Sequence, residues 1–292
     1  MGIRTDKWAI AFRKKKGSML DDAGGFKMIP QNYKGFYADP FLFEDGGKTY
    51  LFAEYYEHKI NRGYFVYAVY DKEKNAFSDF KEIIREDYHL SYPLVFRYKG
   101  EIYIMPEAGH SETLYLYRAK RFPDEWEKAN VLLDGIKLAD TTPFLYEDRY
   151  YAVTKSNRTK QDPMLLLKID RDTWSVTGKT VVTDDISVSR PGGHVIQQDD
   201  KYYMVTQDCE KGYGTALNFV EFSIDSDDHL KYRLMKKITP DKVKVDGVKT
   251  VTRIHTYNFT EDIEVIDFKY PITDIYRAFW LGVWRIKNKF GK

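Results

Sequence analysis

The fold is decided by the stretch Asp39-Pro40-Phe41-Leu42-Phe43, a polar turn at 45–47, and Lys48-Thr49-Tyr50-Leu51-Phe52. Two short apolar runs joined by a glycine-containing turn are typical of a β-hairpin. Similar hairpins follow at 92–104, 142–153 and 192–205, and a weaker copy lies at 255–266. Equivalent positions in the first four copies are 53, 50 and 50 residues apart, and they are occupied by Pro40, Pro93, Pro143 and Gly193.

Further strand candidates lie between the hairpins, at 64–70, 114–117, 164–169 and 216–224. A repeat of about 50 residues that contains a hairpin and additional strands is the pattern of a β-propeller blade. We therefore predict an all-β fold, a five-bladed β-propeller with a short C-terminal amphipathic helix. The alternative is a β-sandwich or two small β domains, which the regular spacing disfavours.

The composition of the 292-residue chain excludes several classes of protein. With 43% hydrophobic and 31% charged residues, the chain can bury a core and is not globally disordered. Its single cysteine, Cys209, cannot form an internal disulfide or a cysteine-based zinc site. A formal net charge of +2 excludes a uniformly basic nucleic-acid-binding protein. The sequence shows no secretory signal and no apolar run of about 18 residues, so we expect a cytoplasmic protein, peripheral at the inner face of the membrane.

The charge divides the chain into three predicted parts. A basic N-terminal segment at 1–30 begins with six Lys/Arg and one Asp in residues 1–17, the propeller spans 31–270, and a basic amphipathic helix spans 271–292. In that helix an apolar stripe recurs at helical spacing, at Ile275, Phe279, Val283, Ile286 and Phe290. We expect both ends of the chain, including Trp8, Ile10 and Phe12, to lie on an anionic membrane surface. The alternative for the helix is packing on the propeller or on a partner protein.

The repeat also predicts a ring of polar residues. In a propeller, the residues before the innermost strand and after the next strand meet around the same channel mouth. Carboxylates crowded with cations in such a mouth would have pKa values that move apart, as acid–base chemistry on a sugar requires. The alternative is that these side chains only cap strand ends. The predicted ring comprises Asp39, Glu54, His89, Tyr92, Glu107, Asp140, Lys155, Arg190, His194, Gln207, Asp208 and His255.

Several of these positions lie in motifs that resemble one family. The sequence resembles the N-terminal domain of plant glucosamine inositolphosphorylceramide transferase over roughly 36–255, and shorter bacterial relatives of that domain are associated with surface polysaccharide synthesis. The resemblance implies a role in making polysaccharide or glycolipid. In the plant protein a separate C-terminal domain is the recognised transferase, and we expect no room for it here. The motifs are Ala38-Asp39-Pro40-Phe41, His89-Leu90-Ser91-Tyr92-Pro93, Pro106-Glu107-Ala108, Phe122-Pro123-Asp124-Glu125-Trp126, Asp140-Thr141-Thr142, Ser189-Arg190-Pro191-Gly192-Gly193 and Gln207-Asp208-Cys209.

More distantly, the pattern is similar to the five-bladed glycoside hydrolases that cleave arabinans, xylans and fructans. That likeness implies a base or nucleophile at Asp39 and an orienting carboxylate at Asp140. Those hydrolases carry their general acid, a Glu, on the fourth blade, where this chain has Gln207-Asp208, while Glu107 lies on the second hairpin. The departure argues against ordinary glycosidase chemistry. A related five-bladed group includes phosphorolytic enzymes and mannosyltransferases.

The resemblances and the ring together give the expected function. We expect a glycosyltransferase or transglycosylase-type enzyme with Asp39 as base, Glu107 as general acid and Asp140 as orienter. The positive charges of Arg190 and Lys155 suit a phosphate, a sugar nucleotide or an anionic sugar, and the turn at 191–193 is expected to present backbone N–H groups to such an anion. The alternatives are a glycoside hydrolase, or a non-catalytic glycan-binding module that assists a partner transferase.

The expected partners are a carbohydrate, a sugar nucleotide or a lipid-linked glycan, together with the anionic membrane surface, and no nucleic acid. No organic cofactor is expected, because the sequence has no phosphate-binding P-loop, no GxGxxG and no HExxH motif. A divalent cation in the channel remains an open alternative.

Overall fold

The hairpins of the repeat form separate four- or five-stranded antiparallel sheets in a computed structural model, which describes residues 4–290 except 18–19, 21–22 and 109–110. The first blade contains β3 (Gly35–Asp45), β4 (Lys48–Glu57), β5 (Arg62–Asp71), β6 (Ala76–Phe77) and β7 (Lys81–Ile84). The second contains β8 (Ser91–Tyr98), β9 (Glu101–Glu107), β10 (Leu114–Arg121) and β11 (Glu125–Leu133). The third contains β12 (Leu138–Tyr146), β13 (Arg149–Ser156), β14 (Met164–Asp170) and β15 (Ser175–Thr183).

The fourth blade contains β16 (Arg190–Pro191), β17 (Ile196–Gln198), β18 (Lys201–Asp208), β19 (Ala216–Ile224) and β20 (Leu230–Ile238). A short 3₁₀ helix, η1 (Pro240–Lys242), leads to the fifth blade, which contains β21 (Arg253–Phe259), β22 (Ile263–Thr273), β1 (Arg4–Lys14) and β2 (Lys27–Met28). The fold is therefore the predicted five-bladed β-propeller, and the sandwich alternative is wrong.

The N-terminal residues differ from the expectation. Strand β1 pairs antiparallel with β22 over its whole length, from Arg4 opposite Thr273 to Lys14 opposite Ile263. The ring of blades is thus closed by the two ends of the chain, and residues 4–14 belong to the propeller rather than to a separate basic segment. Alternation along β1 explains why the strand is buried on both sides: Ile10 and Phe12 pack toward the first blade, and Ala9 and Ala11 toward the fourth.

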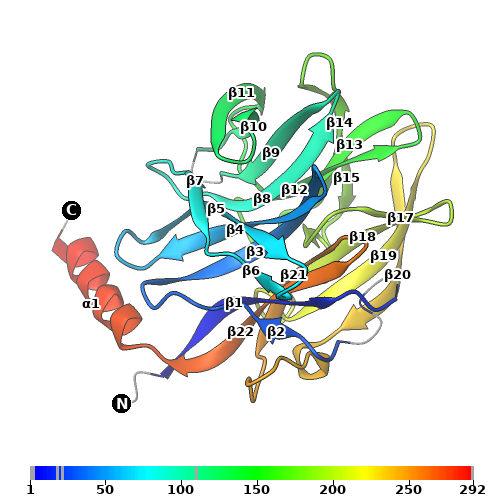
Figure 1. Cartoon of the computed structure of the whole chain (residues 1–292). Helices are drawn as coiled ribbons and strands as arrows, with labels where there is room; N and C mark the ends of the chain where they lie inside the picture. The colour runs from blue at the N-terminus through cyan, green and yellow to red at the C-terminus, as the bar shows by residue number, and fades with distance from the viewer. Residues whose placement is uncertain (1–3, 18–19, 21–22, 109–110, 291–292) are drawn as a thin grey trace.

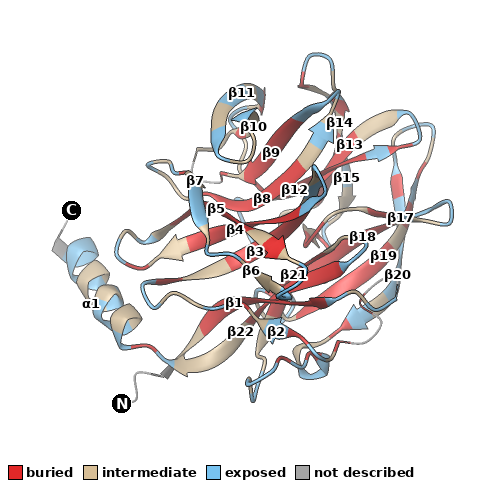
Figure 2. Ribbon diagram, in the orientation of Figure 1, coloured by how far each residue is buried: buried red, intermediate tan, exposed pale blue. Residues whose placement is uncertain are grey.

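The core lies between the blades. Each of five apolar clusters joins one blade to the next, so that each blade packs against its two neighbours in the ring. Figure 2 shows the buried positions concentrated in the middle of the strands. Aromatic side chains fill these seams, as the edge-to-face contact of Phe41 with Tyr92 illustrates at 4.7 Å between ring centroids. Tyrosine thus contributes large buried rings to the seams between neighbouring blades.

The expected C-terminal helix is present as α1 (Ile275–Phe290) and projects from the edge of the propeller beside the N-terminus (Figure 1). The Asp274 side chain caps it by accepting the Arg277 backbone N–H at 2.8 Å. Trp284 Nε1 donates to the His58 carbonyl at 3.1 Å, which ties the helix to the first blade. Among the described residues, no helix has the length and apolar character needed to cross a bilayer.

Candidate functional site

Backbone bulges at the start of the innermost strands place the key side chains. The register of the first hairpin shifts between Ala38 and Phe41, and the second, third and fifth blades carry the same shift. Asp39, Tyr92 and Asp140 occupy these bulges with φ of 51°, 55° and 52°. Left-handed backbone is rare for residues with a side chain, and bulges of this kind turn a side chain out of the sheet. The repeat therefore holds strained residues at equivalent places around the channel.

Asp39 lines a pocket of about 240 Å³, which we call the mouth pocket, whereas Tyr92 and Asp140 are not among its lining residues. Half of the predicted ring lies there, namely Asp39, Glu54, His89, Glu107, Arg190 and His255. The other lining residues, which the sequence analysis did not assign to the ring, are Trp8, Phe36, Ala38, Tyr56, Ser91 and Tyr213.

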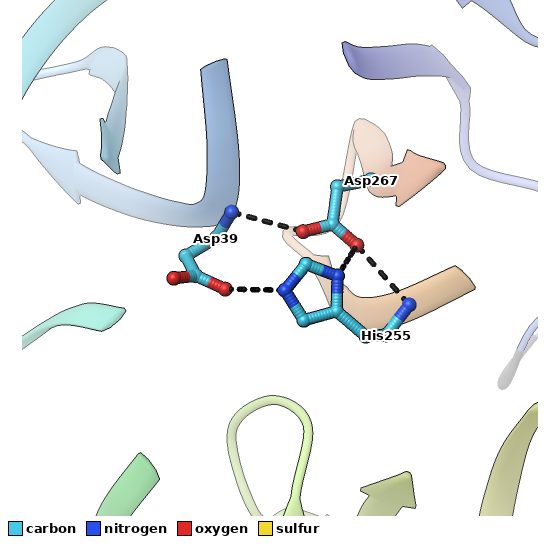
Figure 3. A group of neighbouring side chains, drawn as sticks. All are labelled: Asp39, His255 and Asp267. Carbon is cyan, nitrogen blue, oxygen red and sulfur yellow. Dashed lines mark hydrogen bonds and ion pairs between the residues drawn. The ribbon is translucent and has the colours of Figure 1, made fainter. Parts of the chain in front are cut away.

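His255 lies between two buried carboxylates (Figure 3). Its Nε2 is 3.0 Å from Asp39 Oδ1, and its Nδ1 is 2.8 Å from Asp267 Oδ1. Burial alone would lower the pKa of His255, but the charges and hydrogen bonds of Asp267 and Asp39 outweigh it and raise the pKa to about 10. At neutral pH the ring is therefore an imidazolium.

The imidazolium in turn fixes the state of Asp39. Burial would raise the pKa of Asp39, but the hydrogen bond and charge of His255 and the backbone N–H of Tyr92 hold that pKa below its usual value. The Tyr92 N–H donates to Asp39 Oδ2 at 3.0 Å, and Thr256 Oγ1 donates to Oδ1 at 3.2 Å. Asp39 is thus an ionised carboxylate held in one orientation.

Within the described part of the chain, the same three residues form the group that could hold a metal ion. Ligand atoms of Asp39, His255 and Asp267 lie within 4.8 Å of one another. Carboxylate oxygen and imidazole nitrogen suit several divalent cations. Both imidazole nitrogens point at carboxylates here, so an ion would have to displace the proton that now supplies the positive charge.

Two other carboxyl groups in the mouth pocket behave oppositely to Asp39. Burial is the largest cause that raises the pKa of Glu54 well above its usual value, and the negative charge of Asp39 is the second. Burial and then the charge of Asp140 do the same to the pKa of Glu107. Both glutamates therefore hold their protons more tightly than usual and Asp39 less tightly, so the surroundings move the pKa values of carboxyl groups in one pocket apart.

Arg190 joins the second, third and fourth blades. Its Nε donates to Asp140 Oδ2 at 2.5 Å, and its Nη2 is 3.3 Å from Glu107 Oε2. Gln207 Nε2 also donates to Asp140 Oδ2 at 2.8 Å. The guanidinium lies over the Tyr213 ring, 4.8 Å from its centroid. Asp140 thus orients Arg190, and Gln207 orients Asp140.

Other predicted ring residues lie outside the mouth pocket. Tyr92 is buried, and its hydroxyl contacts Thr142 Oγ1 at 2.8 Å and accepts the Gly193 N–H at 2.9 Å, so its side chain joins blades. His194 lines a separate pocket beside Tyr257, and burial lowers its pKa to about 4. These positions do not support direct substrate contacts at the mouth.

Asp208 and Lys155 also differ from the expectation. The Asp208 side chain on β18 pairs with Lys237 on β20, beyond the intervening strand β19 and away from the mouth pocket. Lys155 opens into an adjacent pocket of about 500 Å³, which shares Arg190 and Tyr213 with the mouth pocket.

The expected anion-binding turn at 191–193 is also not observed. The N–H groups of Gly192 and Gly193 already donate to Val205 O and Tyr92 Oη. A Cβ at these two glycines would lie 2.6 Å from His255 O and 2.1 Å from Tyr257 O. The glycines are therefore needed for close packing against the fifth blade.

A further pocket of about 180 Å³ lies between α1 and the propeller, and it shares Trp8, Phe36 and Tyr56 with the mouth pocket. Arg277, Trp280 and Trp284 of α1 form its opposite wall. Trp280 Nε1 is buried and has no hydrogen-bond partner among the described residues. The mouth pocket thus continues toward the helix on one side and toward Lys155 on the other.

The comparisons agree with this architecture. The family model described as the N-terminal region of glucosamine inositolphosphorylceramide transferase 1 matches residues 27–245. The transferase of that name from Arabidopsis thaliana is 30% identical over 204 residues, which cover 67% of this chain and 26% of the relative. That from Oryza sativa subsp. indica is 31% identical over 188 residues, covering 61% and 25%. The chain spans about a quarter of the length of these relatives.

Solved structures with a similar fold are glycoside hydrolases. The catalytic domain of a GH62 α-L-arabinofuranosidase from Coprinopsis cinerea superposes with a TM-score of 0.60 at 9% identity, covering 89% of this chain and 97% of that one. A GH43 endo-arabinanase from Bacillus licheniformis gives 0.52 at 13% identity, with coverage of 80% and 88%. At such identities the likeness concerns the fold alone.

Proposed function

The chain belongs to the family of the N-terminal region of glucosamine inositolphosphorylceramide transferase 1, and from that premise we propose that it transfers a sugar at the mouth pocket. The donor is a sugar linked through phosphate, and the acceptor is a hydroxyl group of a growing glycan or glycolipid. The reaction uses paired carboxyl groups of the propeller.

One observation carries this proposal: the mouth pocket contains Asp39, whose pKa is lowered, together with Glu107, whose pKa is raised. Pairs of carboxyl groups whose surroundings move their pKa values apart supply an acid and a base to one reaction. Asp39 accepts the proton of the attacking hydroxyl, and the new bond forms between that oxygen and the anomeric carbon. The bond to the leaving oxygen breaks with its electron pair, and Glu107 protonates that oxygen.

The charges beside this pair favour an anionic substrate. Asp140 holds Arg190 against Glu107, so a fixed positive charge lies next to the proposed leaving group. Arginine in such a place recognises phosphate oxygens. Aromatic faces of Trp8, Tyr56 and Tyr213 line the same pocket and suit stacking on sugar rings.

A second candidate is glycan recognition without chemistry, and the aromatic lining favours it equally. The two candidates differ in what the carboxyl variants do. Asp39→Asn and Glu107→Gln should abolish turnover and keep ligand binding if the protein is an enzyme.

Of the two chain ends expected at a membrane surface, only α1 keeps an exposed apolar face among the described residues. Trp8, Ile10 and Phe12 are buried in the fifth blade and cannot lie on a bilayer. On α1, by contrast, Ile275 and Phe279 are 68% and 62% exposed. Basic residues at 285 and 287 flank this stripe and are exposed. An apolar helix face bordered by Lys and Arg is typical of an interfacial anchor, and we propose that α1 holds the propeller at the cytoplasmic face of an anionic membrane.

The experiment is a screen of the full chain with sugar nucleotides and polyprenyl-phosphate sugars, in which mass spectrometry detects transfer or hydrolysis. Asp39→Asn and Glu107→Gln are compared with two control variants, Asp228→Asn and Glu221→Gln. Asp228 and Glu221 form ion pairs outside the mouth pocket. Turnover that persists in both mouth variants would show that the catalytic assignment is wrong. Saturation-transfer binding without turnover by the unaltered protein would select the recognition candidate.

A further inference from the structure

The pocket beside the mouth is strongly cationic. It lies between the β13–β14 loop and the end of β18, and we call it the basic pocket. Lys155, Arg158, Lys160 and Arg190 line it, and no Asp or Glu is among its described lining residues. Its volume of about 500 Å³ lies in the range of ligand pockets. A concave surface with one sign of charge attracts ligands of the opposite sign.

The charge of Lys155 is the most informative feature of the basic pocket. The residue is only 5% exposed, and its Nζ donates to the Asp162 carbonyl at 2.6 Å and to Ser189 Oγ at 3.2 Å. Among the described residues, no carboxylate forms an ion pair with it. Buried cations usually have an anionic partner, because a lone buried charge is costly. An anion from outside the chain would supply that partner.

The loop that carries Arg158 and Lys160 is held by internal hydrogen bonds. The Asp162 carboxylate accepts hydrogen bonds from Ser156 Oγ at 3.1 Å and from the Arg158 N–H at 2.8 Å. Arg158 Nη2 also contacts Glu112 at 3.2 Å, but these side chains are 58% and 45% exposed. Such an exposed pair is weak in water, so a bound anion can compete for the guanidinium.

The basic pocket is continuous with the mouth pocket, because Arg190 and Tyr213 line both. An anion beside Lys155 would therefore lie next to the guanidinium that also contacts Glu107. This is where the leaving group of a sugar transfer must be held.

We propose that the basic pocket binds the diphosphate group of the activated sugar donor, while the sugar occupies the mouth pocket. The role of the basic pocket in sugar transfer rests on the proposed function, whereas the binding of diphosphate does not. When the bond between the anomeric carbon and the phosphate oxygen breaks, the electron pair stays on the phosphate. Lys155 and Arg190 then neutralise the charge that develops there.

Calorimetric titration of the full-length protein with inorganic pyrophosphate tests the proposal. The double variant Arg158→Ala/Lys160→Ala alters only exposed side chains of the loop, and we expect it to raise the Kd roughly tenfold. Lys155→Met keeps the aliphatic stem and should weaken binding further. The matched control Lys201→Ala/Arg233→Ala removes two exposed cations on the fourth blade and should bind like the unaltered protein.

Two sources of diphosphate are distinguished by further titrations with uridine diphosphate and with geranyl diphosphate. Tighter binding of the first identifies a nucleotide-linked donor, and tighter binding of the second a lipid-linked donor. The proposal is overturned if pyrophosphate does not bind, or if the loop variant and the control variant bind it equally well. The Asp39→Asn variant should bind pyrophosphate with unchanged affinity. Loss of turnover therefore tests the proposed function, and loss of pyrophosphate binding tests the basic pocket.

Discussion

His255 Nε2 lies 3.0 Å from Asp39 Oδ1, across a gap of more than two hundred residues in sequence and at the seam where the first and fifth blades meet. Asp39 lies on β3 and His255 on β21, so this ion pair joins the innermost strands of the first and last blades. The pair links the closure of the propeller to the ionisation of the proposed base.

The first prediction concerns stability against pH. The folded pKa of His255, about 10, lies above its usual value of 6.5, so its contribution to stability is fully present below about pH 6.5. That contribution is lost as the pH rises through about 10. We therefore expect the melting temperature of the unaltered protein to decrease as the pH rises from about 6.5 to about 10. The decrease should correspond to a few kcal/mol of unfolding free energy, the order of magnitude that a pKa shift of this size gives. His255→Gln should be less stable at neutral pH, and its melting temperature should change less over the same range. Parallel curves for the two proteins would contradict the assignment of an imidazolium.

A second prediction concerns the pH dependence of turnover. Asp39 must be ionised and its pKa is lowered, whereas Glu107 must be protonated and its pKa is raised, so kcat/KM should follow a broad bell. Glu107→Gln should lower kcat roughly 10²- to 10⁴-fold and remove the alkaline limb. Glu221→Gln, on the outer surface of the fourth blade, should leave the bell unchanged. An alkaline limb that survives in Glu107→Gln would assign the acid to another group, with Glu54 the next candidate.

How far the sequence could locate this site depends on whether a residue's place follows from the repeat. Equivalent positions in the hairpins put Asp39, Glu107 and Arg190 in one pocket, because the spacing of about 50 residues between hairpins recurs along the chain. Neighbouring residues of a strand face opposite sides, which explains why Gln207 points to Asp140 while Asp208 points to Lys237.

Other members of the site could not be found in this way. Trp8 reaches the mouth pocket only because β1 pairs with β22 at the far end of the chain. Asp267 lies in β22 between Ile266 and Phe268, where a carboxylate within an apolar run was a usable signal that the repeat did not highlight. The orientation of α1 also depended on tertiary contacts. Ile275, Phe279 and Ile286 of the predicted stripe face solvent, and the tryptophans beside them face the propeller.

The third prediction concerns the close packing of Gly63 against Glu54. A Cβ on Gly63 would lie 2.3 Å from Glu54 Oε1 and 2.6 Å from the Leu90 carbonyl, and the backbone atom cannot easily move. Gly63→Ala should therefore destabilise the fold by about 1–3 kcal/mol and displace Glu54 from the mouth pocket. Chemical denaturation measures the first effect, and ligand affinity measures the second. Gly178→Ala is the matched control, because its nearest contact is 3.4 Å away on a flexible lysine. Equal stability of the two variants would show that the contact at Gly63 is relaxed in solution.

The last prediction concerns the exposed face of α1. Phe279 and Ile286 are 62% and 61% exposed and point away from the propeller. Replacing both with serine should leave the melting temperature unchanged, since neither side chain contributes to the core. It should weaken co-sedimentation with phosphatidylserine vesicles at least tenfold, because burial of each side chain in the interface is worth about 1.5–3 kcal/mol.

The matched control for this experiment replaces Val181 and Leu234 with serine, because these exposed apolar side chains lie on the outer strands β15 and β20 and are 66% and 49% exposed. Loss of vesicle binding in the α1 variant alone places the helix on the membrane, with the pocket of Trp280 and Trp284 between the bilayer and the mouth pocket. Equal loss in both variants would indicate nonspecific adhesion, and no loss in either would leave a protein partner as the occupant of that face.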